Sequence, residues 1–499
     1  MGDQRETPIF SAIKKYIEEG VLPFHVPGHK QGRALPELKE YVGERVLAMD
    51  LTCVPGLDNI CNPKDVIAEA EALAAEAFGA DRAFFLVNGT TSGIQTMILA
   101  VCQPGEKIIM PRNAHRSALG GLILSGAHPV YVEPEINRDY GISMGVTPER
   151  VKRALEEHPD AKAVFLVSPN YYGTVPPLRG IAAVAHDYGV PVLVDEAHGA
   201  HLPFHPQLPP SAMACGADMA ATSAHKLAGS LTQSSILLLK EGRVEGKHVK
   251  ATLNIFQTTS PSYILLASLD LARKQMALKG RELLEKALEI AHWIRRELAR
   301  IDGIEIMGEE VTVLPGCVDL DPTKITVNVQ GLGLTGYEME GILRREYKIQ
   351  VELSDLYNVL ILISIGDDWD MARALVQAFQ DVARRRPFKN VIRFCPPLPP
   401  IPPMAVLPRQ AFYSSTRTVE LEEAEGEISA EAITAYPPGI PLVCPGEVIS
   451  YEIIEYVKVL KKERAELQGP EDPELKYIKV LRDTVRLPEF SPAALAGQG

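Results

Sequence analysis

The feature that most constrains the fold is an alternation of short apolar runs with amphipathic stretches of helical period, beginning near Arg82. The apolar runs mark expected strands: AFFLV, KIIM, AVFLV, VPVLV and MAAT. Strands that alternate with helices favour a mostly parallel sheet with crossover helices on its faces. Ligands of such sheets bind beyond the carboxyl ends of the strands, so we expect the chemistry in the loops that follow these runs.

The whole chain has 499 residues, too many for one hydrophobic core, so we expect several domains. The pattern predicts an N-terminal arm at 1–60, a large domain at 61–275, a small α+β domain at 276–390, a proline-rich linker at 391–410 and a C-terminal α+β domain at 411–499.

Within these parts the periodicity predicts individual elements. A short helix is expected from Pro8 to Glu19, followed by an irregular FHVPGHKQG segment, because Pro27 and Gly28 interrupt regular structure. Beyond Ser260 we expect long helical structure to Ile301. We also expect strands at KITVNV and VLILIS, a helix near Tyr337 to Glu346 and another from about Glu447 to Arg464.

The charge balance narrows the possible partners. The formal net charge is −13, which argues against nucleic acid or an anionic membrane as a partner and suits a cationic substrate. No stretch of about 18 apolar residues occurs, and the N-terminus lacks an apolar segment behind a basic flank, so a cytoplasmic location is expected. The seven scattered cysteines contain no CxxC and predict reduced thiols.

Lys226 stands out in SAHKLAGSLTQSS, where a single lysine follows an expected strand among small and hydroxyl side chains. A confined lysine loses its proton readily and forms Schiff bases with aldehydes. A lysine in an ordinary polar loop is the alternative that this motif alone leaves open.

Asp195 ends the apolar strand in VPVLVDEAHGAH. A carboxylate at a buried strand end needs a cationic partner, and the protonated pyridine nitrogen of pyridoxal phosphate is one. An aspartate that caps the following turn is the alternative. A helicase DEAH box is excluded because the chain has no GxxxxGK[ST] phosphate loop.

Two further loops add polar groups. NGTTSGIQ follows the strand AFFLV and opens a helix, so backbone N–H groups and the hydroxyls of Thr90, Thr91 and Ser92 should converge on a phosphate, unless they only cap the helix. Ser223 and His225 would approach the same phosphate. His115, in PRNAHRSA, follows the strand KIIM and suits stacking on a planar ring, although a lone histidine is more often a structural hydrogen-bonding residue.

Taken together, these motifs resemble the bacterial Orn/Lys/Arg decarboxylases, a family of fold type I, aminotransferase-like, pyridoxal-phosphate enzymes. FHVPGHKQG, NGTTSG, PRNAHRSA, SPNYYGT, VDEAHGAH, TSAHKLAGSLTQSS, TTSPSY and YPPGIPLVCPGE all match, so the resemblance spans nearly the whole chain. Because the motifs begin close to the N-terminus, the chain is more similar to the short biosynthetic branch, in which arginine decarboxylases are well represented.

The resemblance implies a role for each matching residue. Lys226 would carry the cofactor, Asp195 would pair with its pyridine nitrogen, His115 would stack on its ring and Ala197 would pack against the opposite face. The remaining residues implied near the cofactor are Thr90, Thr91, Ser92, His198, Ser223, His225 and Ser260. In similar enzymes the site lies between two subunits, with Ser260 or its neighbours reaching the partner's phosphate, so at least a homodimer is expected.

The implied reaction is decarboxylation of a basic amino acid, for arginine to agmatine, a polyamine precursor. Lys226 or His225 would return the proton to Cα. A desolvated cationic substrate end requires an acidic partner, for which Glu352, Asp355 and Asp58 are the candidates, unless they are solvated or structural carboxylates.

Several alternatives remain. Lysine or ornithine would serve as substrate in the same family, and an aminotransferase or another lyase would share the cofactor residues. No metal is expected, because Pro203 and Pro27 disrupt a common helical face for the histidines of HGAHLPFH and HVPGH. A catalytically silent scaffold would be expected to have lost part of the cofactor motif, which is complete here.

Overall fold

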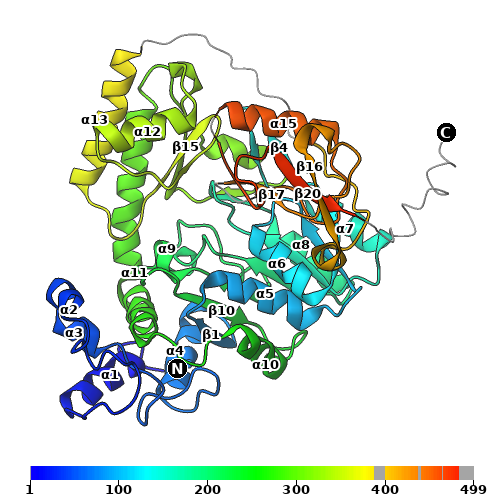
Figure 1. The fold of residues 1–499 in the computed structure, drawn as a ribbon. Coiled ribbons are helices and arrows are strands. Elements are labelled where there is room, and N and C mark those ends of the chain that lie inside the picture. Colours follow the sequence, from blue (N-terminus) through cyan, green and yellow to red (C-terminus); the bar gives the residue numbers. More distant parts are fainter. Residues whose placement is uncertain (1, 387–398, 437–439, 464, 483–499) are drawn as a thin grey trace. The chain divides into compact units, whose positions relative to one another are not determined.

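The computed structural model describes residues 2–386, 399–436, 440–463 and 465–482. The chain divides into two compact units, which are described separately. Unit 1 comprises Met1–Ala100, Pro191–Ala287 and Ser364–Gly366, and unit 2 comprises Val101–Val190, Leu288–Ile363 and Asp367–Gly499. As predicted, the fold is of the mixed α/β class with a mostly parallel sheet (Figure 1).

Unit 1 contains four sheet strands in the order β1-β10-β9-β8. β8 and β9 are parallel, whereas β10 is antiparallel to both of its neighbours. The sequence did not predict β10. Only the one-turn helix α9 (Ala224–Leu227) separates it from β9, so no crossover helix carries the chain back and β10 returns in the opposite direction. The bounds are β1 Arg82–Leu86, β8 Val192–Asp195, β9 Met219–Thr222 and β10 Ser235–Leu239.

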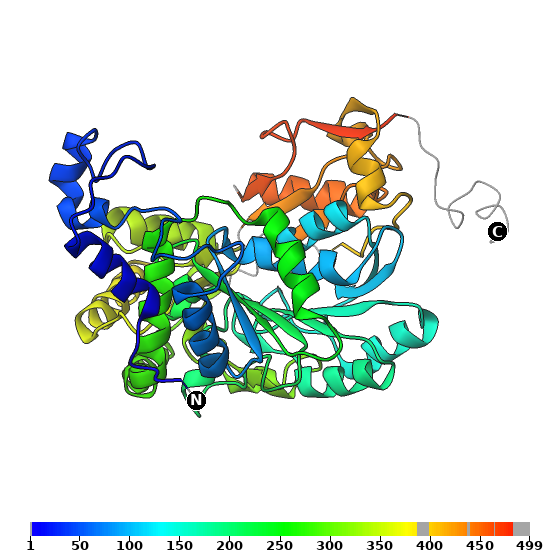
Figure 2. The same cartoon turned by 90° about the horizontal axis from the view of Figure 1, so that it is seen from below.

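The helices of unit 1 include the predicted first helix. Figure 2 shows this helix, α1, beside the N-terminal part of α11, which ends three residues before the expected Ile301. α2 and α3 were not predicted, because they are short and α2 buries no side chain that would mark a helical period. The bounds are α1 Pro8–Glu18, α2 Pro36–Val42, α3 Glu44–Ala48, α4 Val66–Phe78, α5 Gly89–Val101, α10 Gly246–Phe256 and α11 Tyr263–Leu298, of which the part from Leu288 onward belongs to unit 2.

Unit 2 contains three parallel strands in the order β6-β2-β3. β2 and β6 lie at the predicted runs KIIM and AVFLV, whereas β3 was not predicted. Amphipathic helices connect them. The bounds are β2 Lys107–Pro111, α6 Arg116–Ser125, β3 His128–Val132, α7 Pro148–Glu157, β6 Ala163–Val167 and α8 Leu178–Asp187.

The remainder of unit 2 forms smaller sheets. The predicted strands KITVNV and VLILIS are β13 and β15 of an antiparallel sheet ordered β11-β13-β15-β14, and the predicted helix between them is α12. The bounds are β11 Glu305–Ile306, β13 Lys324–Asn328, α12 Gly336–Glu346, β14 Leu353–Ser354, β15 Asn358–Leu362 and α13 Trp369–Arg385.

The C-terminal region has its own apolar core beneath α15, contributed in part by Ile433, Val443, Ile453, Val457 and Ile478. Its elements are α14 Pro408–Tyr413, β16 Thr416–Glu420, β17 Ile433–Tyr436, β18 Ile440–Val443, α15 Tyr451–Lys462, β19 Glu466–Gln468 and β20 Tyr477–Leu481.

The predicted start of α15 at Glu447 was wrong. Glu447 and Val448 form isolated β-bridges, and the Ser450 side chain then accepts the Ile453 N–H and caps the helix. The helix therefore begins at Tyr451 and ends at Lys462.

Parts of other predictions lie outside the described residues. These parts are residues 387–390 of the small α+β domain, the first eight residues of the linker, 391–398, residues 437–439 and the last 17 residues of the C-terminal domain, 483–499, and the expected helix end at 464. The domain boundaries remain predictions. In the part of the chain that the structure describes, no helix is long and apolar enough to cross a membrane.

Candidate active site

The loop after β1 leads directly into a helix start. Gly89 has a φ of +72°, a left-handed conformation that favours glycine, and its N–H donates to the Gln233 carbonyl at 2.9 Å. The Asn88 side chain donates to the Phe256 carbonyl at 2.7 Å. Thr91 is then exposed in the first turn of α5, where the helix dipole favours an anion.

Thr90 and Ser92, by contrast, are buried and bonded within the protein. The Thr90 hydroxyl hydrogen-bonds to the Ser223 hydroxyl and to the Ser235 hydroxyl, the latter at 2.8 Å. The Ser92 hydroxyl donates to the Gly89 carbonyl at 2.8 Å. Ser235 was not singled out from the sequence, because nothing distinguishes it there from the neighbouring hydroxyl residues.

Helix α5 lies very close to the sheet of unit 1. A Cβ atom added at Gly93 would lie 2.9 Å from Leu86 Cδ1 and 3.1 Å from Ala221 Cβ. Glycine at this position therefore allows the close helix–strand contact that fixes the start of α5.

Asp195 is the last residue of β8 and is buried. Burial raises the pKa of its carboxyl to about 6, opposed by the Ala197 N–H, which donates at 3.0 Å, and by the charge of Lys226. Its carboxylate forms no ion pair with any residue that the structure describes. The strand therefore ends in a carboxylate that lacks the direct cationic partner its burial calls for.

Glu196, the next residue, was missed by the sequence analysis. It is almost fully buried, and burial raises the pKa of its carboxyl to about 8, which the hydrogen bond from the Ala212 N–H at 2.6 Å opposes. It is therefore mostly uncharged at neutral pH. The DEAH sequence contains no signal that its glutamate points inward, because both acidic residues follow the same apolar run.

Lys226 lies on α9, directly after β9, and is half-buried. Its Nζ is 2.8 Å from Nε2 of the buried His198, so the two predicted cofactor residues meet. The neighbouring His225 donates from Nδ1 to the Ser234 carbonyl at 2.9 Å. A lysine in hydrogen-bond contact with an imidazole can exchange a proton with it.

Two other candidates of unit 1 lie near each other in the loops between α3 and α4 and between α10 and α11. Ser260 is exposed, and its loop is attached through the Tyr263 hydroxyl, which donates to the Leu57 and Asp58 carbonyls. The Asp58 carboxylate accepts N–H groups from Asn59, Lys64, Asp65 and Ile67. Asp58 thus has a structural role at the start of α4.

His115 belongs to unit 2 and caps α6, where its Nδ1 accepts the Ser117 N–H. Because Nδ1 is an acceptor, the proton of the neutral ring lies on Nε2. The side chain is half-buried, whereas residues 111–114 before it are buried.

The two remaining substrate candidates, also in unit 2, differ in their surroundings. Asp355 accepts hydrogen bonds from the Tyr172 hydroxyl at 2.7 Å and from the N–H groups of Tyr357 and Asn358, which indicates a structural carboxylate. Glu352 is exposed, and its carboxylate forms no hydrogen bond or ion pair with the described residues.

Unit 1 therefore contains an exposed threonine at a helix start, a buried strand-end carboxylate and a lysine in contact with a histidine. These groups suit a planar cofactor that carries an aldehyde, a ring nitrogen and an anionic group. No cluster of three or more side chains suited to metal binding occurs among the described residues.

Comparisons with known proteins agree with this chemistry. The Orn/Lys/Arg decarboxylase major-domain model matches residues 7–371, and the C-terminal-domain model of the same family matches residues 398–487. The arginine decarboxylase of Bacillus subtilis (strain 168) is 47% identical over 483 residues, 96% of this chain and 99% of the relative. The arginine decarboxylase of Bacillus anthracis is 46% identical over 485 residues, 96% and 98% of the two chains.

Among solved structures, the constitutive lysine decarboxylase of E. coli is similar in fold. The TM-score is 0.81 at 22% sequence identity, and the match covers 96% of this chain and 82% of that one. At this identity the likeness shows the fold alone.

Proposed function

The chain belongs to the Orn/Lys/Arg decarboxylase family, and from this premise we propose that it converts L-arginine to agmatine and CO₂ with pyridoxal phosphate as cofactor. The choice of arginine is supported by the two Bacillus relatives, both named arginine decarboxylase and both matched over nearly their whole length. Agmatine would serve polyamine synthesis.

The observation that carries the proposal is the buried Asp195 carboxylate at the end of β8. It forms no ion pair with the described residues, and a protonated pyridine nitrogen is a cation that would offset the cost of its burial. When bound, pyridoxal phosphate withdraws electrons from the Cα bond held perpendicular to its ring, which allows CO₂ to leave.

The residues of the chain would divide the remaining tasks. Lys226 would hold the cofactor covalently, and Asp195 would keep the pyridine nitrogen protonated. Thr91, which is exposed at the start of α5, is the best placed of the hydroxyl residues to bind the phosphate. Thr90, Ser92, Ser223 and His225 would lie close to the same phosphate. His115 and Ala197 would contact the two faces of the ring.

Proton return to Cα is assigned to Lys226 or His225. The 2.8 Å contact between Lys226 Nζ and His198 Nε2 favours Lys226, because His198 can accept or restore its proton between turnovers. His198 then contributes to catalysis as well as to cofactor binding.

The assembly and location are part of the same proposal. We expect a homodimer in which the exposed Ser260 or a neighbouring residue of TTSPSY reaches the phosphate bound by the partner subunit. A cytoplasmic enzyme is supported by its cysteines, six of which are free thiols in the structure.

Glu352 is the best of the three candidates for the distal guanidinium, because its carboxylate has unoccupied acceptors, whereas Asp58 and Asp355 are already bonded within the chain. Glu352→Lys should raise KM for arginine strongly and leave cofactor binding intact. Glu346→Lys, which alters another exposed glutamate of unit 2, is the control. An unchanged KM in Glu352→Lys would remove Glu352 from the substrate pocket.

The test of the reaction measures cofactor-dependent CO₂ release from arginine in the wild type, in Lys226→Ala and in Lys247→Ala, a control at an exposed lysine of α10. The wild type and Lys247→Ala should release CO₂ and form no keto acid, and Lys226→Ala should lose both covalent cofactor and activity. Keto acid without CO₂ would instead indicate an aminotransferase.

A further inference from the structure

A buried cluster of unit 2 joins the C-terminal region to the loop that carries His115. The carboxylate of Glu447, which is fully buried, accepts from Arg112 Nη2 at 2.8 Å and from the Cys444 N–H at 2.7 Å. The Arg112 guanidinium also donates to the Leu442 carbonyl and to Cys444 Sγ, both at 3.1 Å. It lies over the Tyr131 ring, 4.9 Å from the centroid.

Two further hydrogen bonds anchor the loop between β2 and α6, in addition to the contacts of the Arg112 side chain. The Arg112 N–H donates to the Val132 carbonyl at 3.2 Å, and the buried Asn113 side chain donates to the Met144 carbonyl at 3.0 Å. Residues 112 and 113 are therefore held both by these two bonds and by the contacts of the Arg112 guanidinium with Leu442, Cys444 and Glu447 of the C-terminal region. His115 is the first side chain of this segment that is partly exposed.

The geometry of the Arg112 site is specific for a guanidinium. Its donors reach a carboxylate, a carbonyl and a thiol at once, and its flat face lies on an aromatic ring, which a lysine cannot reproduce. The second carboxylate oxygen of Glu447, Oε1, is buried without a hydrogen-bond partner. Both hydrogen bonds of the Glu447 carboxylate thus go to its other oxygen, Oε2.

We propose that Arg112 and Glu447 are positioning residues for the decarboxylation, through which the C-terminal region fixes the loop that presents His115 to the cofactor ring. This inference rests on the proposed function, because it requires that His115 contact the ring. It assigns a part in the chemistry to a region that supplies none of the predicted cofactor residues. A displacement of about 1 Å in such a group can cost about 100-fold in rate.

Glu447→Gln and the double variant Arg112→Met/Glu447→Met test the proposal. The double variant removes both charges together, so it avoids the unpaired buried arginine that Glu447→Gln leaves. Glu427→Gln is the matched control, because it breaks a 2.7 Å ion pair with Arg417 in the same region at partly exposed side chains. The measurements are kcat per bound cofactor, KM for arginine, the visible circular dichroism of the bound cofactor and the thermal midpoint.

We expect Glu447→Gln to lower kcat per bound cofactor about 10- to 100-fold and to change the circular dichroism of the cofactor, with KM within about threefold of the wild type. The double variant should recover thermal stability without recovering kcat, and Glu427→Gln should match the wild type. Wild-type kcat in the double variant, or an unstable Glu447→Gln with unchanged kcat and dichroism per bound cofactor, would overturn the proposal. A wild type that releases no CO₂ from arginine would instead refute the proposed function, and the dichroism would still report the ring environment.

Discussion

Asp195 and Glu196 are adjacent carboxyl groups whose pKa values burial raises to about 6 and about 8. A carboxyl whose pKa is higher in the folded than in the unfolded chain opposes folding at high pH. As the pH rises from the unfolded to the folded pKa, the unfolded chain releases its proton while the folded chain retains it. Both residues therefore destabilise the cofactor-free protein at neutral and alkaline pH.

Asp195→Asn should affect stability and activity in opposite directions. In the cofactor-free protein at pH 7 it should raise the free energy of unfolding by up to about 3 kcal/mol. The asparagine does not ionise, so the variant avoids the loss of stability that the buried Asp195 carboxylate causes as the pH rises from 3.8 to about 6. With cofactor it should lower kcat about 100- to 1000-fold, since an electrostatic partner of the reaction is lost.

Urea unfolding with and without pyridoxal phosphate, together with CO₂ release, measures both effects. Asp187→Asn, at an exposed residue of α8, should change neither quantity. Lower stability of cofactor-free Asp195→Asn would show that the carboxylate already has a stabilising partner within the chain.

Glu196→Gln should change the pH profile of stability. In the wild type, burial of Glu196 does not lower the free energy of unfolding below pH 4.5, where its carboxyl is neutral in both states. As the pH rises from 4.5 toward about 8, the free energy of unfolding falls by about 5 kcal/mol, because only the unfolded chain releases the proton. The variant should therefore gain stability over the wild type between pH 5 and pH 9, as measured by urea unfolding of the cofactor-free protein. Parallel profiles for the two proteins would mean that Glu196 ionises normally.

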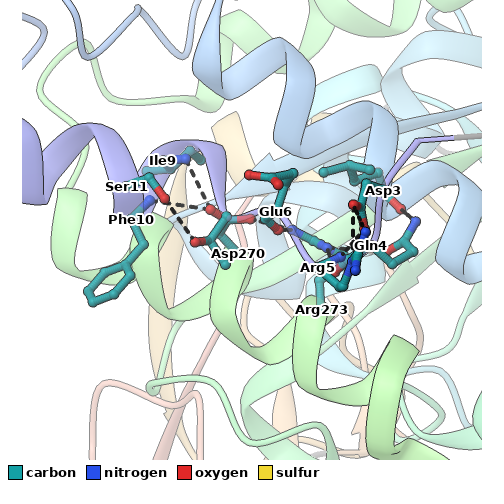
Figure 3. A network of polar contacts seen from close by, with 11 residues as sticks. Asp3, Gln4, Arg5, Glu6, Ile9, Phe10, Ser11, Asp270 and Arg273 are labelled. Atoms are coloured by element: carbon teal, nitrogen blue, oxygen red, sulfur yellow. Dashed lines mark hydrogen bonds and ion pairs between the residues drawn. The ribbon is translucent and has the colours of Figure 1, made fainter.

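At the scale of elements, α1 is attached to α11 through one buried ion pair (Figure 3). The side chains of Asp270 and Arg273 are fully buried on α11, and Arg273 Nη2 lies 2.7 Å from Asp270 Oδ1. Asp270 accepts the N–H groups of Ile9 and Phe10 in the first turn of α1, where a helix favours negative charge. Arg273 donates to the carbonyl groups of Gln4 and Glu6.

Asp270→Ala should cost about 3–5 kcal/mol of unfolding free energy, because it leaves Arg273 buried without its carboxylate and the first turn of α1 without its cap. The N-terminal segment should also become sensitive to limited proteolysis. Asp370→Ala removes the partner of Arg373 at the surface of α13 and should cost no more than about 0.5 kcal/mol. Equal losses in the two variants would contradict a special role for the buried pair.

The strongest elements were predictable because their sequence patterns were simple. The runs AVFLV and MAAT coincide with β6 and β9, and Asp195 ends its strand as expected. The antiparallel β10 was missed, since its direction depends on the lack of a crossover helix after β9 rather than on its own residues. The start of α15 was misplaced because tertiary bridges hold Glu447 and Val448 extended.

Within the candidate site, the sequence predicted which residues would take part, but it did not show how each is hydrogen-bonded within the chain. The Thr90 hydroxyl is bonded to Ser223 and the Ser92 hydroxyl to Gly89, so that of these three neighbouring residues only Thr91 is exposed. The Asp58 carboxylate proved to accept backbone N–H groups of the residues that follow it, and the Asp355 carboxylate accepts N–H groups of its neighbours and the Tyr172 hydroxyl. Such roles depend on distances between loops, which no local pattern contains.

At the scale of the whole molecule, the proposed site shared between two subunits predicts complementation. A Lys226→Ala chain and a Ser260→Asp chain should each form inactive homodimers, the second because its carboxylate repels the phosphate bound by the partner. Mixed and refolded in equal amounts, they should recover about a quarter of wild-type activity, because half of the dimers are hybrids with one intact site. No recovery with confirmed hybrid dimers would place Ser260 and Lys226 in the same subunit's site.

Decarboxylation of arginine can be measured by product analysis of the cofactor-loaded enzyme with arginine, lysine and ornithine supplied separately. CO₂ release is measured with the amine formed from each amino acid. Arginine should have the highest kcat/KM and yield agmatine and CO₂ in equal amounts. Preferred conversion of lysine or ornithine would contradict the substrate assignment, and a bound cofactor without CO₂ from any of the three would contradict decarboxylation itself.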